Sequence, residues 1–142
     1  MIQATWHAEA NGPGVRVSTM GESDTTVHTG LGEGIGLKGH SPWEPYLIVR
    51  RSGRDGRENR FVSVLEPFST EPFLDEIAPV EMNGNRVGVR LRSGQVTHYL
   101  IQGDPESELA VDLDGSMLRF KGDWAFLELN GESIAKAQVV NG

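Results

Sequence analysis

Cysteine is absent from the 142 residues of this sequence. A disulfide framework and a thiolate metal site are therefore excluded. A chain without cysteine is compatible with the cytoplasm, the periplasm and the outside of the cell. The residues alone leave the localisation unknown.

Long apolar runs are also missing. No stretch of about 18 apolar residues occurs, so we predict no membrane insertion. Residues 1–7 (MIQATWH) contain neither a basic region nor an apolar segment of the kind found in signal peptides. The strand pattern begins at the second residue, which favours a segment of a longer protein.

Positive charge is scarce. Lysine and arginine number 13 against 20 acidic residues, and the formal net charge is −7. Such a chain repels nucleic acid over most of its surface. We therefore predict no nucleic-acid partner, although a local basic patch would still attract an anion.

Short apolar runs, separated by single glycines and prolines, make up most of the sequence. Val87, Val89 and Leu91 alternate with Arg90 and Arg92, which is the period of a half-buried strand. Two dipeptides, Asp114-Gly115 and Asn130-Gly131, suit tight hairpin turns. The pattern predicts an all-β fold, an antiparallel β-sandwich of about eleven strands, with residues 1–142 forming one domain.

Two runs stand out because their apolar residues are continuous, residues 45–51 and residues 60–66. Continuous runs are typical of strands covered on both faces, so we expect both to be central and Phe61 to lie in the core. Residues 21–39 contain few apolar side chains and are expected to be loop with at most one weak strand. Trp6 and Trp124 are expected in the core.

Catalytic and metal-binding motifs are lacking. The sequence has no Gly-x-Ser-x-Gly element and no glycine-rich phosphate loop that opens a helix, so no catalytic residue and no cofactor is predicted. Residues 112–115 (DLDG) resemble a calcium loop only faintly, and a hairpin turn explains them better. The four histidines form no close pair and predict no metal site: His7, His28, His40 and His98.

Residues 50–60 are basic against this acidic background. This segment contains five arginines and two acidic residues, Asp55 and Glu58, which gives a local net charge of +3. Guanidinium groups bind carboxylate and sulfate in a bidentate manner, and two aromatic residues lie just upstream. One interpretation is a binding site for an acidic glycan, and the other is a solvated loop whose arginines pair with nearby acids. The candidate glycan-binding residues are Trp43, Tyr46, Arg50, Arg54, Arg57 and Arg60, with Arg51 expected on the opposite face of the strand from Arg50.

Residues 46–53 (YLIVRRSG) and 61–68 (FVSVLEPF) resemble the C-terminal β-region of heparinase II/III-like polysaccharide lyases. The later runs 87–89 (VGV), 94–100, 114–116 (DGS) and 120–122 (FKG) are similar as well. The likeness covers roughly residues 40–131. Its most specific element is the FVSVLEP run.

The resemblance implies a function. Members of that family join an α/α-toroid domain to β-sandwich layers and cleave uronic-acid-containing polysaccharides by β-elimination. It implies that this chain is a non-catalytic accessory domain, excised from a larger lyase, periplasmic or extracellular. Its partners would be the α/α-toroid catalytic domain of the same parent chain and an acidic polysaccharide. No family catalytic residue matches a position here.

Two other functions remain open. An autonomous carbohydrate-binding module requires an exposed aromatic or arginine platform on one face. An enzyme in its own right requires titratable side chains that converge in a deep cleft. Fold resemblance alone does not decide between them.

Overall fold

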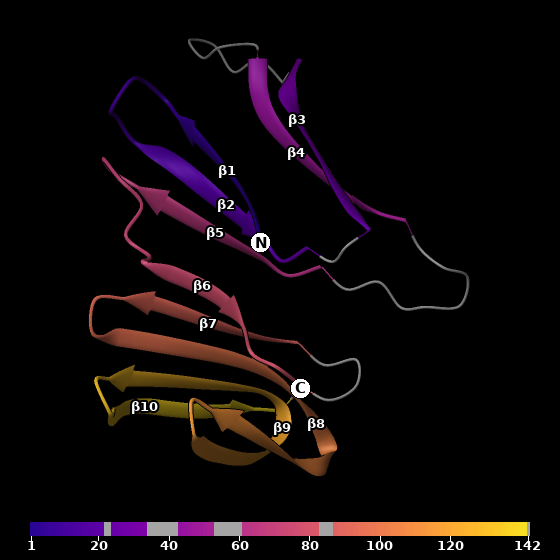
Figure 1. The fold of residues 1–142 in the computed structure, drawn as a ribbon, viewed down its shortest axis with the longest axis vertical. Helices are drawn as coiled ribbons and strands as arrows, with labels where there is room; N and C mark the ends of the chain where they lie inside the picture. Colours follow the sequence, from indigo (N-terminus) through magenta and orange to yellow (C-terminus); the bar gives the residue numbers. More distant parts are fainter. Residues whose placement is uncertain (22–23, 34–42, 53–60, 83–86, 142) are drawn as a thin grey trace. The chain divides into compact units, whose positions relative to one another are not determined.

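The computed structural model describes residues 1–21, 24–33, 43–52, 61–82 and 87–141. These residues form ten strands and no helix, and every strand pair is antiparallel (Figure 1). The all-β class predicted from the sequence is confirmed. The chain forms two compact units, residues 1–72 and 73–142. That the two units together form one domain remains a prediction.

The first unit contains two antiparallel sheets. Strands β1 (Ile2–His7), β2 (Gly14–Thr19) and β5 (Ser63–Phe68) form one sheet in the order β1-β2-β5. Strands β3 (Thr25–Glu33) and β4 (Trp43–Arg51) form the second, a ribbon with nine residues in each strand. The long strand β3 arises from a segment that was expected to be mostly loop.

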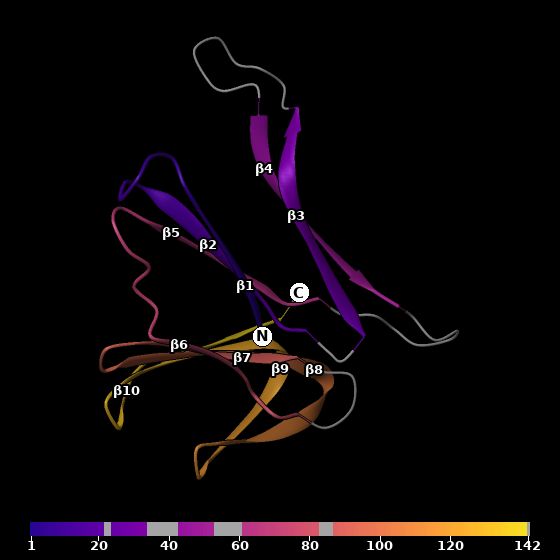
Figure 2. The same cartoon turned by 45° about the horizontal axis from the view of Figure 1, so that its top comes forward.

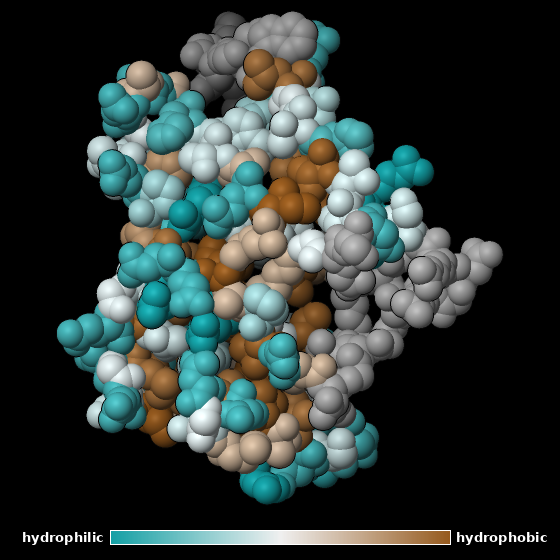
Figure 3. Space-filling model, in the orientation of Figure 1, coloured by the Kyte–Doolittle hydropathy of each residue, from teal (hydrophilic) through white to brown (hydrophobic). Residues whose placement is uncertain are grey.

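The expectation that residues 45–51 and 60–66 form central strands is wrong. Within the described residues β4 pairs only with β3, and β5 is an edge strand. Ile48 is 54% exposed, and Leu65 is exposed as well. Apolar side chains therefore reach the surface among polar ones, as the brown areas of Figure 3 show. A continuous apolar run does not reveal how many neighbours a strand has.

Phe61 is likewise outside the core. It precedes β5 and is exposed, and its ring lies under the guanidinium of Arg51 at 4.9 Å. A truncation of Phe61 therefore removes a surface contact and leaves the core intact.

The second unit is a five-stranded antiparallel meander in the order β10-β9-β8-β7-β6. Asp114 and Gly115 connect β8 to β9 with φ values of 52° and 89°, as a type I′ turn requires. The predicted meander and this hairpin turn are confirmed. The strands are β6 (Glu76–Pro79), β7 (Gly88–Ser93), β8 (Val96–Leu113), β9 (Ser116–Asn130) and β10 (Ser133–Val140).

Strands β8 and β9 are unusually long, with 18 and 15 residues. Each of them joins two segments that the sequence pattern predicts as separate strands. The pairing shifts register between Asp104 and Leu109. A Cβ at Gly103 would collide with the carbonyl oxygen of Gly122 and the ring of Phe120, so the backbones approach closely here. The hairpin bends at this point, and Figure 2 shows its tip, in orange, turned out of the sheet.

The bend creates the core of the second unit. The inner face of the sheet and the apolar face of the tip pack together into one cluster. Trp124 lies outside this cluster and is 44% exposed, contrary to expectation. The reason is strand alternation, because its neighbour Ala125 takes the inward position. The buried residues of the cluster are Tyr99, Ile101, Leu109, Val111, Leu113, Phe120, Ala125 and Leu127.

Among the described residues, no helix has the length and apolar character needed to cross a membrane.

Candidate functional site

The structure places the predicted glycan-binding residues only in part. Arg54, Arg57 and Arg60 lie outside the described residues. Trp43 is the first residue of β4, where its backbone pairs with Glu33. Tyr46 and Arg50 are the two candidates whose surroundings the structure describes.

Tyr46 and Arg50 share one face of the β3–β4 ribbon. Alternation along β4 puts Ile48 between them on the same face. Tyr46 and Arg50 are four residues apart, about 13 Å along an extended strand. The exposed surface made by these residues and their cross-strand partners is here named the ribbon face: Thr26, His28, Gly30, Tyr46, Ile48 and Arg50.

The ring of Tyr46 lies over the backbone of β3. A Cβ at Gly30 would come within 2.5 Å of the Tyr46 hydroxyl, and one at Gly32 would lie 3.4 Å from a ring carbon. Only glycine leaves room for the ring to lie along the ribbon at Gly30. Tyr46 still exposes 42% of its surface. The ribbon face thus presents a flat aromatic ring that lies over two glycines.

Arg50 and Arg51 point to opposite faces, as predicted. Arg50 is exposed on the ribbon face, whereas Arg51 is half-buried. The Nε atom of Arg51 donates a hydrogen bond to Thr25 Oγ1 at 3.4 Å, and its guanidinium covers Phe61. Arg51 therefore does not contribute to the ribbon face.

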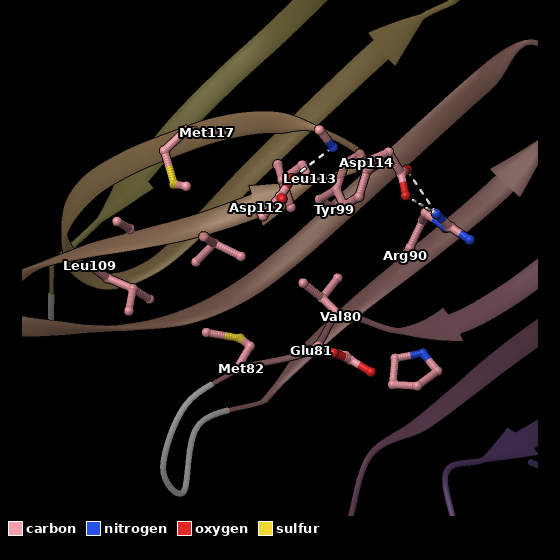
Figure 4. Close-up of a pocket in the computed structure, with 14 residues that line it drawn as sticks. Val80, Glu81, Met82, Arg90, Tyr99, Leu109, Asp112, Leu113, Asp114 and Met117 are labelled. Atoms are coloured by element: carbon pink, nitrogen blue, oxygen red, sulfur yellow. Dashed lines mark hydrogen bonds and ion pairs between the residues drawn. The ribbon is translucent and has the colours of Figure 1, made fainter.

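The second unit contains a groove that the sequence analysis missed. It has a volume of about 850 Å³ and lies between residues 79–82 and the tip of the β8–β9 hairpin (Figure 4). No sequence signal indicated it, because its walls come from segments that only the bend brings together. The apolar walls are formed by Val80, Met82, Leu109, Val111, Leu113 and Met117.

Arg90, Tyr99 and Asp114 line one end of the groove. Together with Glu76, which contacts Arg90, they are here named the Asp114 cluster. Arg90 Nη1 donates hydrogen bonds to both carboxylate oxygens of Asp114, at 2.6 and 2.7 Å. Arg90 Nη2 donates to Glu76 Oε1 at 2.5 Å, and the Tyr99 hydroxyl donates to Asp114 Oδ2 at 2.7 Å. The cluster fastens the hairpin turn to strands β7 and β8.

Protonation in the cluster follows from these contacts. The hydrogen bond from Tyr99, together with the bond and charge of Arg90, lowers the pKa of Asp114. Burial, and then the contact with Asp114, raises the pKa of Tyr99. The two neighbouring carboxylates raise the pKa of Arg90 further above its already high value. At neutral pH, Asp114 is charged and Tyr99 keeps its proton.

This arrangement is unsuited to proton abstraction. A tyrosine that acts as a base needs a lowered pKa, and here the shift has the opposite direction. Both oxygens of Asp114 are already hydrogen-bonded. Titratable side chains thus converge at the groove, but their contacts with one another indicate a structural role, which is to link the hairpin turn to strands β7 and β8.

Other charged groups form pairs that do not line the groove. In the first unit Arg16 Nη2 and buried Glu66 form an ion pair at 2.6 Å, and in the second His98 Nε2 lies 3.1 Å from Glu128 Oε2. Where the structure describes the chain, no three His, Cys, Asp or Glu side chains lie close enough together to hold a metal ion.

No protein-family model matches the chain, and no curated protein matches it either.

Proposed function

We propose that this chain is a non-catalytic accessory β domain of a heparinase II/III-like polysaccharide lyase. It supports the catalytic α/α-toroid domain of its parent chain and contacts an acidic glycan through the ribbon face. An antiparallel sandwich of about eleven strands, counted over the whole chain, is part of this proposal, as is a periplasmic or extracellular location. The sequence resemblance over residues 40–131 suggests the family.

The ribbon face is the observation that carries the glycan contact. The ring of Tyr46 offers a flat apolar surface of the kind on which the C–H face of a sugar stacks. Arg50 offers a guanidinium that binds a carboxylate or a sulfate in a bidentate manner. Their spacing of about 13 Å suits an extended chain that stacks on one residue and places an acidic group at the other.

The Asp114 cluster supports the non-catalytic part of the proposal. Abstraction of a C5 proton requires a base that is unprotonated and reaches the substrate. Tyr99 is the one groove-lining tyrosine among the described residues, and it is buried, protonated and bonded to Asp114. The described part of the second unit therefore favours support over turnover.

A titration of heparin oligosaccharides into the chain, followed by NMR, tests the glycan contact. We expect millimolar affinity, about 4 kcal/mol, with shifts on the ribbon face. The shifts weaken as salt rises, because exposed charges are screened beyond about 10 Å at 0.1 M. Tyr46→Ala and Arg50→Gln should each reduce the affinity several-fold.

Arg119→Gln is the matched control for this titration. It removes the same charge from an exposed site in the second unit, where Arg119 pairs with Glu108 at 3.3 Å. It should leave glycan binding unchanged. Shifts that are absent from the ribbon face, or equal losses in Arg50→Gln and Arg119→Gln, would contradict the proposed contact.

An autonomous carbohydrate-binding module is the second candidate, because the same exposed ring and arginine would serve it. The sequence of the parent gene distinguishes the accessory role from the autonomous module. An α/α-toroid domain encoded before this segment favours the accessory role, and its absence favours the module.

A further inference from the structure

One edge of strand β8 is unpaired where it borders the groove. Strand β7 covers residues 96–101 of β8, and β9 pairs with β8 along its length on the other side. Residues 109–113 lie beyond the end of β7. Among the residues that the structure describes, no strand pairs with them on the side away from β9.

The turn at Asp114-Gly115 determines which backbone groups face the groove. In a two-residue hairpin the flanking residues, Leu113 and Ser116, are a hydrogen-bonded pair. Hydrogen-bonded and non-bonded pairs then alternate, so Val111 and Leu109 also direct their N–H and C=O groups to β9. The backbone groups of Ala110 and Asp112 therefore point away from β9, and residues 109–115 line the groove continuously.

The opposite wall of the groove consists of residues 79–82. Val80 and Met82 present apolar side chains there, facing Leu109 across the opening (Figure 4). A strand inserted between the two walls would bury alternate side chains against these residues. Methionine adapts its shape to different side chains, which suits the binding of a partner segment.

The charge of the groove is negative. Its lining contains three carboxylates, Glu81, Asp112 and Asp114, and one cation, Arg90. Arg90 is neutralised by Asp114 and Glu76. Glu81 and Asp112 are exposed, and Asp112 accepts a hydrogen bond from the N–H of Gly115 in its own turn. A basic side chain of a ligand would complement the negative charge of Glu81 and Asp112.

We propose that the groove binds an extended peptide segment of another protein, which adds to residues 109–113 of β8 as a further strand. The segment alternates apolar residues, which face Val80 and Met82, with basic residues, which face Glu81 and Asp112. Main-chain hydrogen bonds to Ala110 and Asp112 provide the affinity, and the two walls provide the selectivity. This binding site is independent of the ribbon face and of the proposed role in a lyase.

An acetylated hexapeptide of alternating valine and lysine is the probe for this site. Titrated into the full chain and followed by ¹⁵N NMR, it should shift the amides of residues 109–113, Val80 and Met82. The amides of Ala110 and Asp112 should become protected from hydrogen exchange. The same peptide with glutamate in place of lysine should bind at least several-fold more weakly.

Backbone N-methylation of the probe separates strand addition from simple occupation of an apolar groove. It removes the donors of the peptide and keeps its side chains, so affinity should fall roughly tenfold for two lost hydrogen bonds. Equal binding of the methylated peptide would overturn the proposal. Self-association of the chain alone that protects the same amides would overturn it as well, because the occupant would then be a second copy.

Ala110→Pro and Ala110→Val form a matched pair on the protein side. Proline removes the outward N–H without breaking the ladder to β9, whereas valine keeps it. Thermal unfolding establishes that both variants fold, and binding should fall about fivefold in the proline variant only. Equal affinity in both variants would overturn the proposal, and the methylated peptide decides the question if the proline variant does not fold.

Discussion

Asp114 combines two roles at the residue scale. Its φ of 52° belongs to the left-handed region, which aspartate and asparagine tolerate better than most residues. Its carboxylate accepts bonds from Arg90 and Tyr99. The residue that makes the turn possible thus also anchors the tip of the hairpin over the sheet.

We expect Asp114→Asn to lower the free energy of unfolding by about 1 kcal/mol at pH 7. Asparagine keeps the turn conformation, so the loss reports the contacts to Arg90 and Tyr99. The value is modest because the side chain of Asp114 is 62% exposed, and solvent screens its charge. Urea unfolding of wild type and variant measures it.

The pH dependence of this difference follows from the lowered pKa of Asp114. The stabilisation is fully present above the carboxyl pKa of the unfolded chain, about 3.9. It is lost as the pH falls through the lower pKa of the folded state, so wild type and Asp114→Asn should converge in acid. Arg119→Gln, at an exposed ion pair, is the control and should cost less than about 0.5 kcal/mol. A difference that persists unchanged in acid would show that the charge of Asp114 is not the cause.

The bent β8–β9 hairpin is the main feature at the scale of elements. Gly103 and Gly122 allow two long strands to fold back without losing their pairing on either side of the register shift. Asp104 stabilises the extra residues of β8, since its carboxylate accepts bonds from the Glu106 N–H at 2.9 Å and the Ser107 hydroxyl at 2.8 Å. One hairpin thereby supplies both layers of the core.

Two isoleucines test where the core of the second unit lies. Ile101 is 0% exposed in β8, and Ile134 is 68% exposed in β10. We expect Ile101→Ala to cost about 2–5 kcal/mol, and Ile134→Ala to cost less than about 1 kcal/mol. Denaturant unfolding of the two variants makes the comparison with identical side-chain chemistry, and similar losses would contradict the assigned core.

Charge is the dominant property at the scale of the whole molecule. The net charge of −7 repels an acidic glycan over most of the surface. Contact with such a ligand therefore depends on local cations, such as Arg50 on the ribbon face. The acidic groove in the second unit favours a ligand with positive charge instead.

We expect no lyase turnover by the chain when heparin, heparan sulfate or alginate is supplied. The reason is the protonated state of Tyr99 and the engagement of Asp114 and Arg90 with each other. Absorbance of the unsaturated uronate product is the measurement. Turnover that disappears in Tyr99→Phe would assign catalysis to the groove and contradict the accessory role.

The sequence by itself determined the local features. Alternation established the all-β class and the opposite directions of Arg50 and Arg51, and the Asp114-Gly115 dipeptide established its hairpin turn. Each of these depends on a few adjacent residues, whose backbone preferences hold in any context.

Tertiary structure alone decided which strands are edges, where the long hairpin bends and which side chains meet. The Asp114 cluster joins residues separated by 14, 15 and 24 positions, and the groove exists only because the tip returns over residues 79–82. Apolar periodicity shows which face of a strand is buried but not what covers it, so the exposed positions of Ile48 and Leu65 could not be predicted.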